Sequence, residues 1–469
     1  MMGKPNQLEP KLFYHGVSLD RRIPHNHPLR KIEQHINFNF IRSQVADLYG
    51  TRGQPSVDPA VILKLMFLLF YENIKSERAL MEQLPLRLDW LWFCGYDLDD
   101  NTPNHSVLSK ARRRWGLDVF TRFFENILLQ CIQAGLVDGE TIHIDSSMID
   151  ANASKDSLKA QVRLVGSELY EELEENTASE KKLLKRVSTT DSDARLGKKY
   201  GKTTLGYKDH RAVDDKHGII TATVTTPANV NDEKVLTEVI GTHQENTHTA
   251  VKTAVADKAY GIGENYKHLH EQGITPCISH QRTNSRCDPA FNHDKFSYDK
   301  ANNCYLCPAG ETLRQHQLKQ HENRVVYQAD REICQRCQHF EKCVTSKKSG
   351  RQIERNMNKA YIDWADNCLS SYERKRLMAR RKHKAEGSFA DATHHGFKRS
   401  RFRGMKKVRL QNLMIAATQN LRKLMRHICR KPGVQASGSV LGEPLGVVFF
   451  SYGPFLPVKQ FFNRTVSEY

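Results

Sequence analysis

Residues 141–145 read Thr-Ile-His-Ile-Asp, so apolar and polar side chains alternate along this stretch. Alternation with a period of two is typical of a strand that buries one face. It places Asp145 on the polar side, opposite Ile142 and Ile144. A second strand pattern, VKTAVA, ends directly before Asp257. Because open sheets hold their ligands beyond the ends of their strands, Asp145 and Asp257 are candidates for a shared site.

The sequence around these strands predicts a mixed sheet. HRAVDDKHGIITATVTT (210–226) contains two β-branched runs on either side of a turn at Asp215–Gly218. A helix from Glu264 to Gln272 and a strand from Ile274 to Ser279 follow. Several strands and then a strand–helix–strand unit indicate an α/β domain. The charged stretch from Lys155 to Arg186 favours an exposed helical excursion with little core of its own.

Helices are predicted before this sheet. Residues 1 to about 115 look helical throughout, with helices from Pro59 to Asn73 and from Glu77 to Gln83. Thr102-Pro103 offers an N-cap and a proline at the first helical position for a third helix. That helix, HSVLSKARRRWG, is strongly basic. It is either a solvated basic face or a helix-turn-helix-like element that contacts DNA.

Helices are also predicted next to the sheet and after it. A helix from about 116 to 135 leads into the first strand. Long helical patterns follow from Lys359 to Arg381 and from Val408 to His427. Lys431-Pro432-Gly433 ends the last of them. The tail, 431–469, has no periodicity from which a structure or a role can be predicted.

The composition is typical of a folded protein with polyanionic partners. Of its 469 residues 39% are hydrophobic and 9% aromatic, which excludes a disordered chain. Lys and Arg number 71 against 53 Asp and Glu, a net charge of +18 that favours nucleic acid first and acidic membrane second. The most apolar run, Val61 to Tyr71, carries Lys64 and is far shorter than the ~20 residues that span a bilayer. With no signal-peptide pattern at the N-terminus, we expect a cytoplasmic protein without a membrane partner.

Positive charge gathers around a third acidic residue, Glu386. Between Arg374 and Arg409, fourteen residues are Lys or Arg and only two are acidic. Phe389, Phe397 and Phe402 interleave with the basic residues. This mixture favours contact with DNA over a merely solvated helix face.

Carboxylates on a rigid scaffold suit phosphoryl transfer. Two divalent ions activate the attacking oxygen and stabilise the leaving oxygen when a phosphodiester is cut, and such ions prefer carboxylate ligands. Two aspartates at strand positions and an acid late in the chain would supply them, namely Asp145, Asp257 and Glu386. Spacing alone does not single out this trio among 53 acidic residues.

Five of the eleven cysteines lie between Cys304 and Cys343. Two CxxC pairs at this separation have the spacing of a zinc ribbon, in which four thiolates close a structural site without an open position. Free, reduced thiols are the alternative. The other six cysteines are scattered and are expected to pack in the interior: Cys94, Cys131, Cys277, Cys287, Cys368 and Cys429.

Several longer blocks occur in a fixed order along the chain. They are VDPAVILKLMFLLF through NHSVLSKARRRWG (57–116), HIDSSMIDANAS (143–154), the segment 191–236, ADKAYG (256–261) and the segment 386–424. Together they resemble the DDE transposases of bacterial insertion sequences, specifically the "eleven-eighty-two" group. The resemblance covers most of residues 15 to 425.

This resemblance implies a domain plan and a reaction. A helical, DNA-end-binding domain at 1–115 would precede an RNase H-like catalytic domain at 116–430, with a mixed sheet and a Cys-rich, zinc-ribbon-like insertion at 280–350. Asp145, Asp257 and Glu386 would be the catalytic acids that hold Mg²⁺ or Mn²⁺.

The resemblance also implies further ligands. Zn²⁺ would be held by Cys307, Cys334, Cys337 and Cys343, with Cys304 as a spare or a substitute. DNA contacts are expected at Lys208, Lys398, Arg399, Arg401, Arg403, Arg112 and Arg113. One departure concerns the Lys that many relatives carry seven positions after the catalytic Glu and use to contact a DNA phosphate. Thr393 stands there, with His394, His395 and Lys398 close by, so either a neighbour substitutes or the contact is absent.

The expected function is transposition of the protein's own element. Double-stranded DNA, as terminal inverted repeats and as target, would be the partner of a homo-oligomer that associates with the nucleoid when bound to DNA. An RNase H-like nuclease that hydrolyses DNA without strand transfer is the first alternative. An inactive DNA-binding relative, such as a repressor, is the second, and the intact acids argue against it.

Overall fold

The computed structural model describes residue 2 and residues 18–161, 185–199, 201–279, 288–344 and 349–430. The chain divides into two compact units, Met1–His427 and Ile428–Tyr469. Every described helix and strand lies in the first unit, except for the end of the last helix. The predicted helix stop at 431–433, the tail and Cys287 lie outside the described residues.

The N-terminal part is helical, as predicted. Its central helix, α4 (Pro59–Tyr71), is buried on nearly every side, which explains why its sequence is apolar throughout. Asp58 caps this helix by accepting a hydrogen bond from the Ala60 amide at 3.3 Å. The other helices of this part are α1 (Leu19–Arg22), α2 (Pro28–His35), α3 (Phe40–Val45), α5 (Glu77–Gln83), α6 (Leu88–Cys94), α7 (Ser106–Trp115) and α8 (Asp118–Gln133).

The start of α7 differs from the prediction. The helix begins at Ser106 rather than at Pro103, and Thr102 does not cap it. The Asn104 side chain accepts a hydrogen bond from the Ser106 amide at 2.9 Å. This local turn precedes the helix, so the proline lies outside its first turn.

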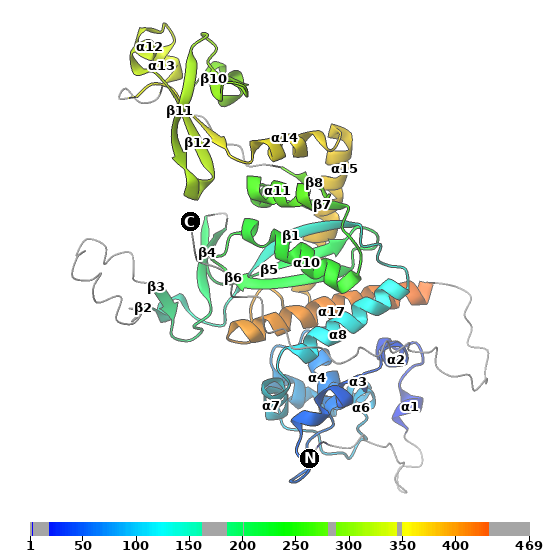
Figure 1. The fold of residues 1–469 in the computed structure, drawn as a ribbon. Helices are drawn as coiled ribbons and strands as arrows, with labels where there is room; N and C mark the ends of the chain where they lie inside the picture. Colours follow the sequence, from blue (N-terminus) through cyan, green and yellow to red (C-terminus); the bar gives the residue numbers. More distant parts are fainter. Residues whose placement is uncertain are drawn as a thin grey trace, which may run out of the picture. The chain divides into compact units, whose positions relative to one another are not determined.

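The central sheet is mixed, as predicted. Strand β1 pairs antiparallel with β5 on one side and parallel with β7 on the other, β8 runs parallel to β7, and β6 and β4 pair with β5 (Figure 1). Ile142 and Ile144 are completely buried, but so is His143 on the other face, so the prediction that this strand buries one face only is wrong. The strands are β1 (Thr141–Asp150), β4 (Arg195–Lys199), β5 (Lys202–Asp214), β6 (Ile220–Pro227), β7 (Thr253–Ala256) and β8 (Thr275–Ile278).

Helices complete the core of this domain. Side chains of α10 (Leu236–Thr247) and α11 (Gly263–Glu271) form one apolar cluster with Ile142 and Ile144. On the long helix α17 (Met405–Arg430), the Asn420 amide hydrogen-bonds both the N–H and the C=O of Ile220, at 2.8 and 2.7 Å. The helix therefore satisfies backbone groups of β6 that a neighbouring strand would otherwise meet.

The charged excursion after β1 is only partly described. Residues 162–184 lie outside the described residues. The flanks form the two-stranded ribbon β2 (Leu158–Gln161) and β3 (Lys185–Ser188), so the helix predicted from Lys155 to Arg186 is wrong at both ends.

The Cys-rich stretch forms its own small sheet. Its strands pair antiparallel in the order β13-β12-β11-β10-β9, around a separate apolar core that includes Tyr305, Leu313 and Tyr327. The elements are β9 (Ser297–Asp299), β10 (Cys304–Leu306), β11 (Thr312–Lys319), β12 (Arg324–Ala329), α12 (Arg331–Arg336), α13 (Phe340–Cys343) and β13 (Gln352–Asn356).

The helical pattern predicted from Lys359 to Arg381 is two helices, α14 (Lys359–Asn367) and α15 (Ser371–Arg381). A capping box at Ser370 and Glu373 starts the second one. Next come a π-helical turn, Lys382–Glu386, and α16 (Gly387–Thr393), ahead of α17. Across the described residues, no helix is both long enough and apolar enough to cross a membrane.

Candidate active site

Strand register places Asp145 beside Asp257. In the parallel pair β1–β7, Ile144 is the partner of Ala256, so the two aspartates are the next residues along neighbouring strands. Asp145 has a side chain that is 16% exposed, and its Oδ1 accepts the Ser146 amide at 2.9 Å. Asp257 accepts the Lys258 amide at 2.6 Å. Both carboxylates are therefore oriented by backbone N–H groups.

The pKa of Tyr260 is affected by the charges of both aspartates. Its ring is buried under the strand ends. Burial, followed by the negative charges of Asp232, Asp145 and Asp257, raises the pKa of the Tyr260 hydroxyl well above its ordinary value. The charges of three aspartates thus act on the Tyr260 hydroxyl.

Glu386 joins this group through Arg381. One guanidinium nitrogen of Arg381 lies 3.4 Å from Asp145 Oδ2, and the other donates to Glu386 Oε1 at 3.0 Å. The Arg381 side chain is 10% exposed and the Glu386 side chain 46%. A single buried cation therefore lies between two of the three predicted acids.

The π-helical turn makes this pairing possible. Arg381 and Glu386 are five residues apart, and on an α-helix five steps of 100° leave side chains about 140° apart. A π turn closes hydrogen bonds between residues five apart, and here the Gly387 amide bonds back to the Lys382 carbonyl. Residues 381 and 386 therefore share a face. Arg381 was not predicted from the sequence, because its spacing from Glu386 fits no α-helical pattern.

A fourth acid, Asp232, lies at the edge of the site and was also missed from the sequence. It accepts hydrogen bonds from Ser146 Oγ and from Lys208 Nζ, each at 2.8 Å. Burial opposes ionisation, but the hydrogen bond and charge of Lys208 hold the pKa of Asp232 below its ordinary value. Lys208 also donates to the Val230 carbonyl at 2.8 Å, and its side chain is 14% exposed. The Lys208 charge is thus paired with Asp232 within the protein.

The predicted DNA-contacting residues after α16 form a loop, 398–403, against the end of β1. The Asp150 amide donates to the Lys398 carbonyl at 2.9 Å, and the Ser400 amide to the Asp150 carbonyl at 2.8 Å. Lys398 Nζ donates to Ser147 Oγ at 3.1 Å, two residues along β1 from Asp145. Lys398, Arg399 and Arg403 are exposed.

Arg401, in the same loop, points inward. It donates to the Leu69 carbonyl at 2.9 Å, to Asn73 Oδ1 at 2.8 Å and to the His395 carbonyl at 3.3 Å. Burial lowers the pKa of Arg401 to about 10. Its guanidinium joins the end of α4 to the loop.

On α7 the two candidate arginines also differ. Arg112 pairs with Glu77 and stacks on the Phe402 ring, 4.4 Å from its centroid. Burial lowers its pKa to about 10. Arg113 is exposed. Only the latter offers its charge to the surface.

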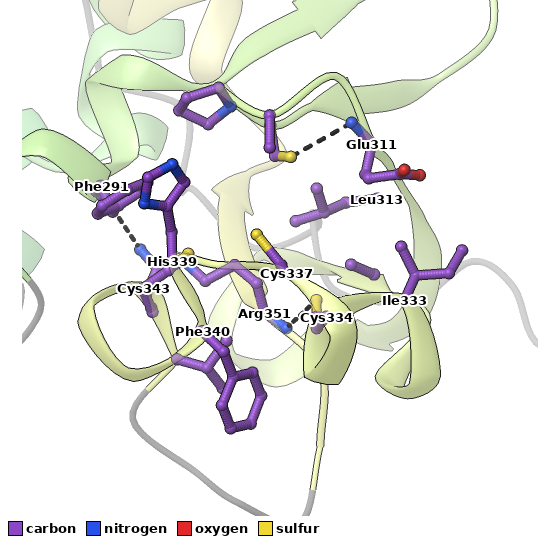
Figure 2. Close-up of a pocket in the computed structure, with 15 residues that line it drawn as sticks. Phe291, Glu311, Leu313, Ile333, Cys334, Cys337, His339, Phe340, Cys343 and Arg351 are labelled. Atoms are coloured by element: carbon purple, nitrogen blue, oxygen red, sulfur yellow. Dashed lines mark hydrogen bonds between the residues drawn. The ribbon is translucent and has the colours of Figure 1, made fainter.

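Four cysteines line one cavity of the small sheet. They are Cys307, Cys334, Cys337 and Cys343, and Figure 2 shows the last three around it. The Glu311 amide donates to Cys307 Sγ at 3.3 Å, and the Arg351 amide to Cys334 Sγ at 3.5 Å.

The remaining cysteines lie elsewhere. Cys304 is buried in β10 and does not line the cavity. Cys94, Cys131 and Cys277 are buried, as expected of packing residues. Cys429 is exposed, so the packing prediction is wrong there.

Metal-binding capacity can be judged from the donor sets. Where the chain is described, no three His, Cys, Asp or Glu side chains are grouped closely enough to hold a metal ion. The chemistry of the donors nevertheless fits: three carboxylates suit Mg²⁺ or Mn²⁺, and four thiols suit Zn²⁺.

Two stretches of the chain match known families. Residues 17–114 match the family described as Transposase domain (DUF772). Residues 306–425, which include Glu386, match the family described as Transposase DDE domain. A search of curated proteins gave no significant match.

The match to the DDE domain supports a DNA-processing enzyme. Together the two matches support an insertion-sequence DDE transposase.

Proposed function

We propose that this transposase cuts DNA at the ends of its insertion sequence and joins them to target DNA by metal-dependent phosphoryl transfer. Two pairwise contacts among the three predicted acids support the proposal. Strand register sets Asp257 beside Asp145, and Arg381 links Asp145 to Glu386. The strand order β6-β5-β1-β7-β8 supports an RNase H-like catalytic domain, and the order of the sequence blocks supports the "eleven-eighty-two" group.

The three acids differ in how the protein holds their carboxylates. Bound Mg²⁺ or Mn²⁺ would activate the attacking oxygen and stabilise the leaving one. Asp145 and Asp257 are fixed by the sheet and by backbone amides, so their positions are set before DNA arrives. Glu386 has an exposed side chain and lies at the end of the π turn.

Lys398 is the residue we propose for the phosphate contact that Thr393 cannot make. Thr393 Oγ1 donates to the Ala390 carbonyl at 2.6 Å within its own helix. The Lys398 ammonium instead lies beside Ser147, and Ser147 is two residues from Asp145 on the same strand. With exposed Arg399 and Arg403 it would hold the DNA backbone near the acids.

Asp257→Asn tests the catalytic assignment. It keeps the size of the side chain but removes the ligand charge, so we expect cleavage of terminal-repeat DNA to fall more than about a hundredfold. Binding of the same DNA should stay within about twofold, because the basic loop is unchanged. Asp363→Asn, on an exposed position of α14, is the control with the same change in charge. Gel-shift titration and a Mn²⁺ cleavage assay measure the two quantities, and cleavage that survives in Asp257→Asn would remove this residue from the site.

The same assay separates transposition from simple hydrolysis. A transposase joins cleaved element ends to a second DNA, whereas a nuclease releases them. Joined products with labelled target DNA support the first function. Cleavage without joined products, under conditions in which the ends stay bound by a homo-oligomer, would favour the nuclease. Binding without cleavage would favour the inactive DNA-binding relative.

We also propose that Cys307, Cys334, Cys337 and Cys343 hold one structural Zn²⁺. The four residues line one cavity, and two backbone amides already donate to their sulfurs, which stabilises thiolates. Burial raises the pKa of Cys334, as do the adjacent Cys307 and Cys337 sulfurs. A cation at the centre would remove that repulsion. Four thiolates leave no open position, so this metal would have no part in the reaction.

Elemental analysis tests the zinc site. We expect about one equivalent of zinc per purified chain, lost in Cys337→Ser. Cys304→Ser is the matched control and should keep its zinc, since Cys304 lies away from the cavity. Less than about a tenth of an equivalent in the unchanged protein would reject the site. Loss of zinc in Cys304→Ser with retention in Cys343→Ser would change the ligand set.

A further inference from the structure

A concave basic pocket lies beside the π turn and takes no part in the site described above. It has a volume of about 390 Å³ and is formed by the β5–β6 turn, the π turn, α16 and α17. This volume lies within the range of pockets that hold small ligands. Its charged or ionisable lining residues are His217, His383, Lys384, Arg422, Lys423, Arg426 and a single acid, Asp391.

The acid is already engaged. Asp391 accepts a hydrogen bond from Gln419 Nε2 at 2.8 Å and lies 3.4 Å from an Arg422 guanidinium nitrogen. The partners of the two lysines in the described chain are carbonyls instead: Lys384 donates to Lys216 at 3.2 Å and Lys423 to Gly218. The cations of the pocket therefore exceed its anions, and what is missing is negative charge.

The turn that closes the pocket is shaped to let the lysines approach. Gly218 has a φ of +70°, which disfavours any side chain. A Cβ there would lie 3.3 Å from Lys384 Cδ and 3.6 Å from Lys423 Nζ. The absence of a side chain thus leaves room for two like charges at one turn.

The charges act on one another. Burial lowers the pKa of Lys423 to about 8, and the charges of Lys384 and Arg211 add to this effect. Burial also lowers the pKa of His217, as do the charges of His427 and Lys384. Such a cluster is stabilised by an anion that neutralises it.

The pocket adjoins the proposed catalytic acids along the chain. Lys384 and Gly387, which line it, stand on either side of Glu386 in sequence.

We propose that this pocket binds a phosphate group, and specifically a backbone phosphate of the DNA on which the enzyme acts. The proposal rests on the function proposed above. The site is distinct from the exposed loop 398–403, because it is built from α17, the β5–β6 turn and the π turn. The phosphate would accept hydrogen bonds from Lys384 and Arg426 and neutralise Lys423.

The test replaces one cation of the π turn and one of α17, in Lys384→Gln with Arg426→Gln. Lys423 is left in place because its burial makes any change there a risk to folding. The control, Lys252→Gln with Lys267→Gln, makes the same change in net charge at exposed positions outside the pocket. Thermal unfolding of both variants must match the parent before binding is compared.

Binding is measured by fluorescence anisotropy with terminal-repeat duplex at several salt concentrations. We expect the pocket variant to bind about tenfold more weakly and its log–log salt slope to fall by about one, as for one lost phosphate contact. The control should change neither value. An unchanged slope in the pocket variant would overturn the proposal.

A second arm identifies the source of the phosphate. Calorimetry with inorganic pyrophosphate should show binding to the parent and to the control but not to the pocket variant. Pyrophosphate binding with an unchanged DNA slope would mean a site for free phosphates, which overturns the DNA assignment. Failure of the proposed function is distinguishable, because it would appear as absent cleavage in the parent protein whatever the pocket variant does.

Discussion

The residue that governs the state of the candidate active site is Arg381. A buried cation that touches two carboxylates is stabilised by them and stabilises them in turn. Its guanidinium lies where positive charge is needed between Asp145 and Glu386. A divalent ion that binds the same two carboxylates must compete with it. Arg381 would then keep the acids together without metal and turn toward DNA phosphate once metal is bound.

Arg381→Gln tests this competition. Without metal we expect a melting temperature lower by a few degrees, because two close carboxylates lose their counter-charge. Mn²⁺ should bind about tenfold more tightly, since nothing has to be displaced, and should raise the melting temperature by more than in the parent.

Arg380→Gln is the control for that variant. Arg380 is the adjacent residue and pairs with Asp215 rather than with the predicted acids. Its loss should lower stability but leave Mn²⁺ affinity unchanged. Calorimetric titration and thermal unfolding measure both effects. Weaker Mn²⁺ binding in Arg381→Gln would show that the arginine supports the metal site rather than competing with it.

At the scale of elements, the loop 398–403 serves two purposes through neighbouring residues. Arg399 is exposed to solvent, whereas Arg401 reaches back to the end of α4. The His395 ring adds a hydrogen bond to the Phe70 carbonyl at 2.9 Å. The loop thus connects the N-terminal helices to the strand that carries Asp145.

Arg401→Ala and Arg399→Ala should therefore affect different properties, namely stability and DNA binding. Loss of Arg401 removes its hydrogen bonds to Leu69, Asn73 and His395, so we expect the free energy of unfolding to fall by about 2 kcal/mol. Arg399→Ala should leave stability within about 0.5 kcal/mol and weaken DNA binding instead. Denaturant titration and anisotropy on the same two proteins measure this. Equal stabilities would show that the contacts of Arg401 to α4 contribute little.

Regular elements were predictable where a local pattern specifies them. The strand before Asp145 and the helix from Glu77 to Gln83 depend on neighbouring residues alone, and both were placed correctly. The ribbon β2–β3 was not predicted, because its pairing joins segments on either side of a long excursion. The choice of Asp145, Asp257 and Glu386 among the acidic residues depended on resemblance alone. The roles of Arg381 and Asp232 require contacts that no local spacing encodes.

For the whole molecule, net charge overstates the surface available to DNA. Lys208, Arg112 and Arg401 were expected to contact DNA, yet each is bound within the protein. Composition counts these side chains equally with exposed Arg113 and Arg399. Only the fold decides which cations meet solvent, and it directs several of them to join elements together.

The π turn also bears on how the molecule tolerates a change in chain length. In a regular helix, one added residue rotates everything beyond it by about 100°, which would turn Glu386 away from β1. The π turn already contains one residue more than a regular helical turn, and it is this residue that brings Glu386 onto the face of Arg381. Deletion of one residue from Lys382–Glu386 would therefore restore a regular helix and separate the two side chains. An insertion within β1 would also disturb the site, because a shift of one residue moves an aspartate to the other face of the sheet.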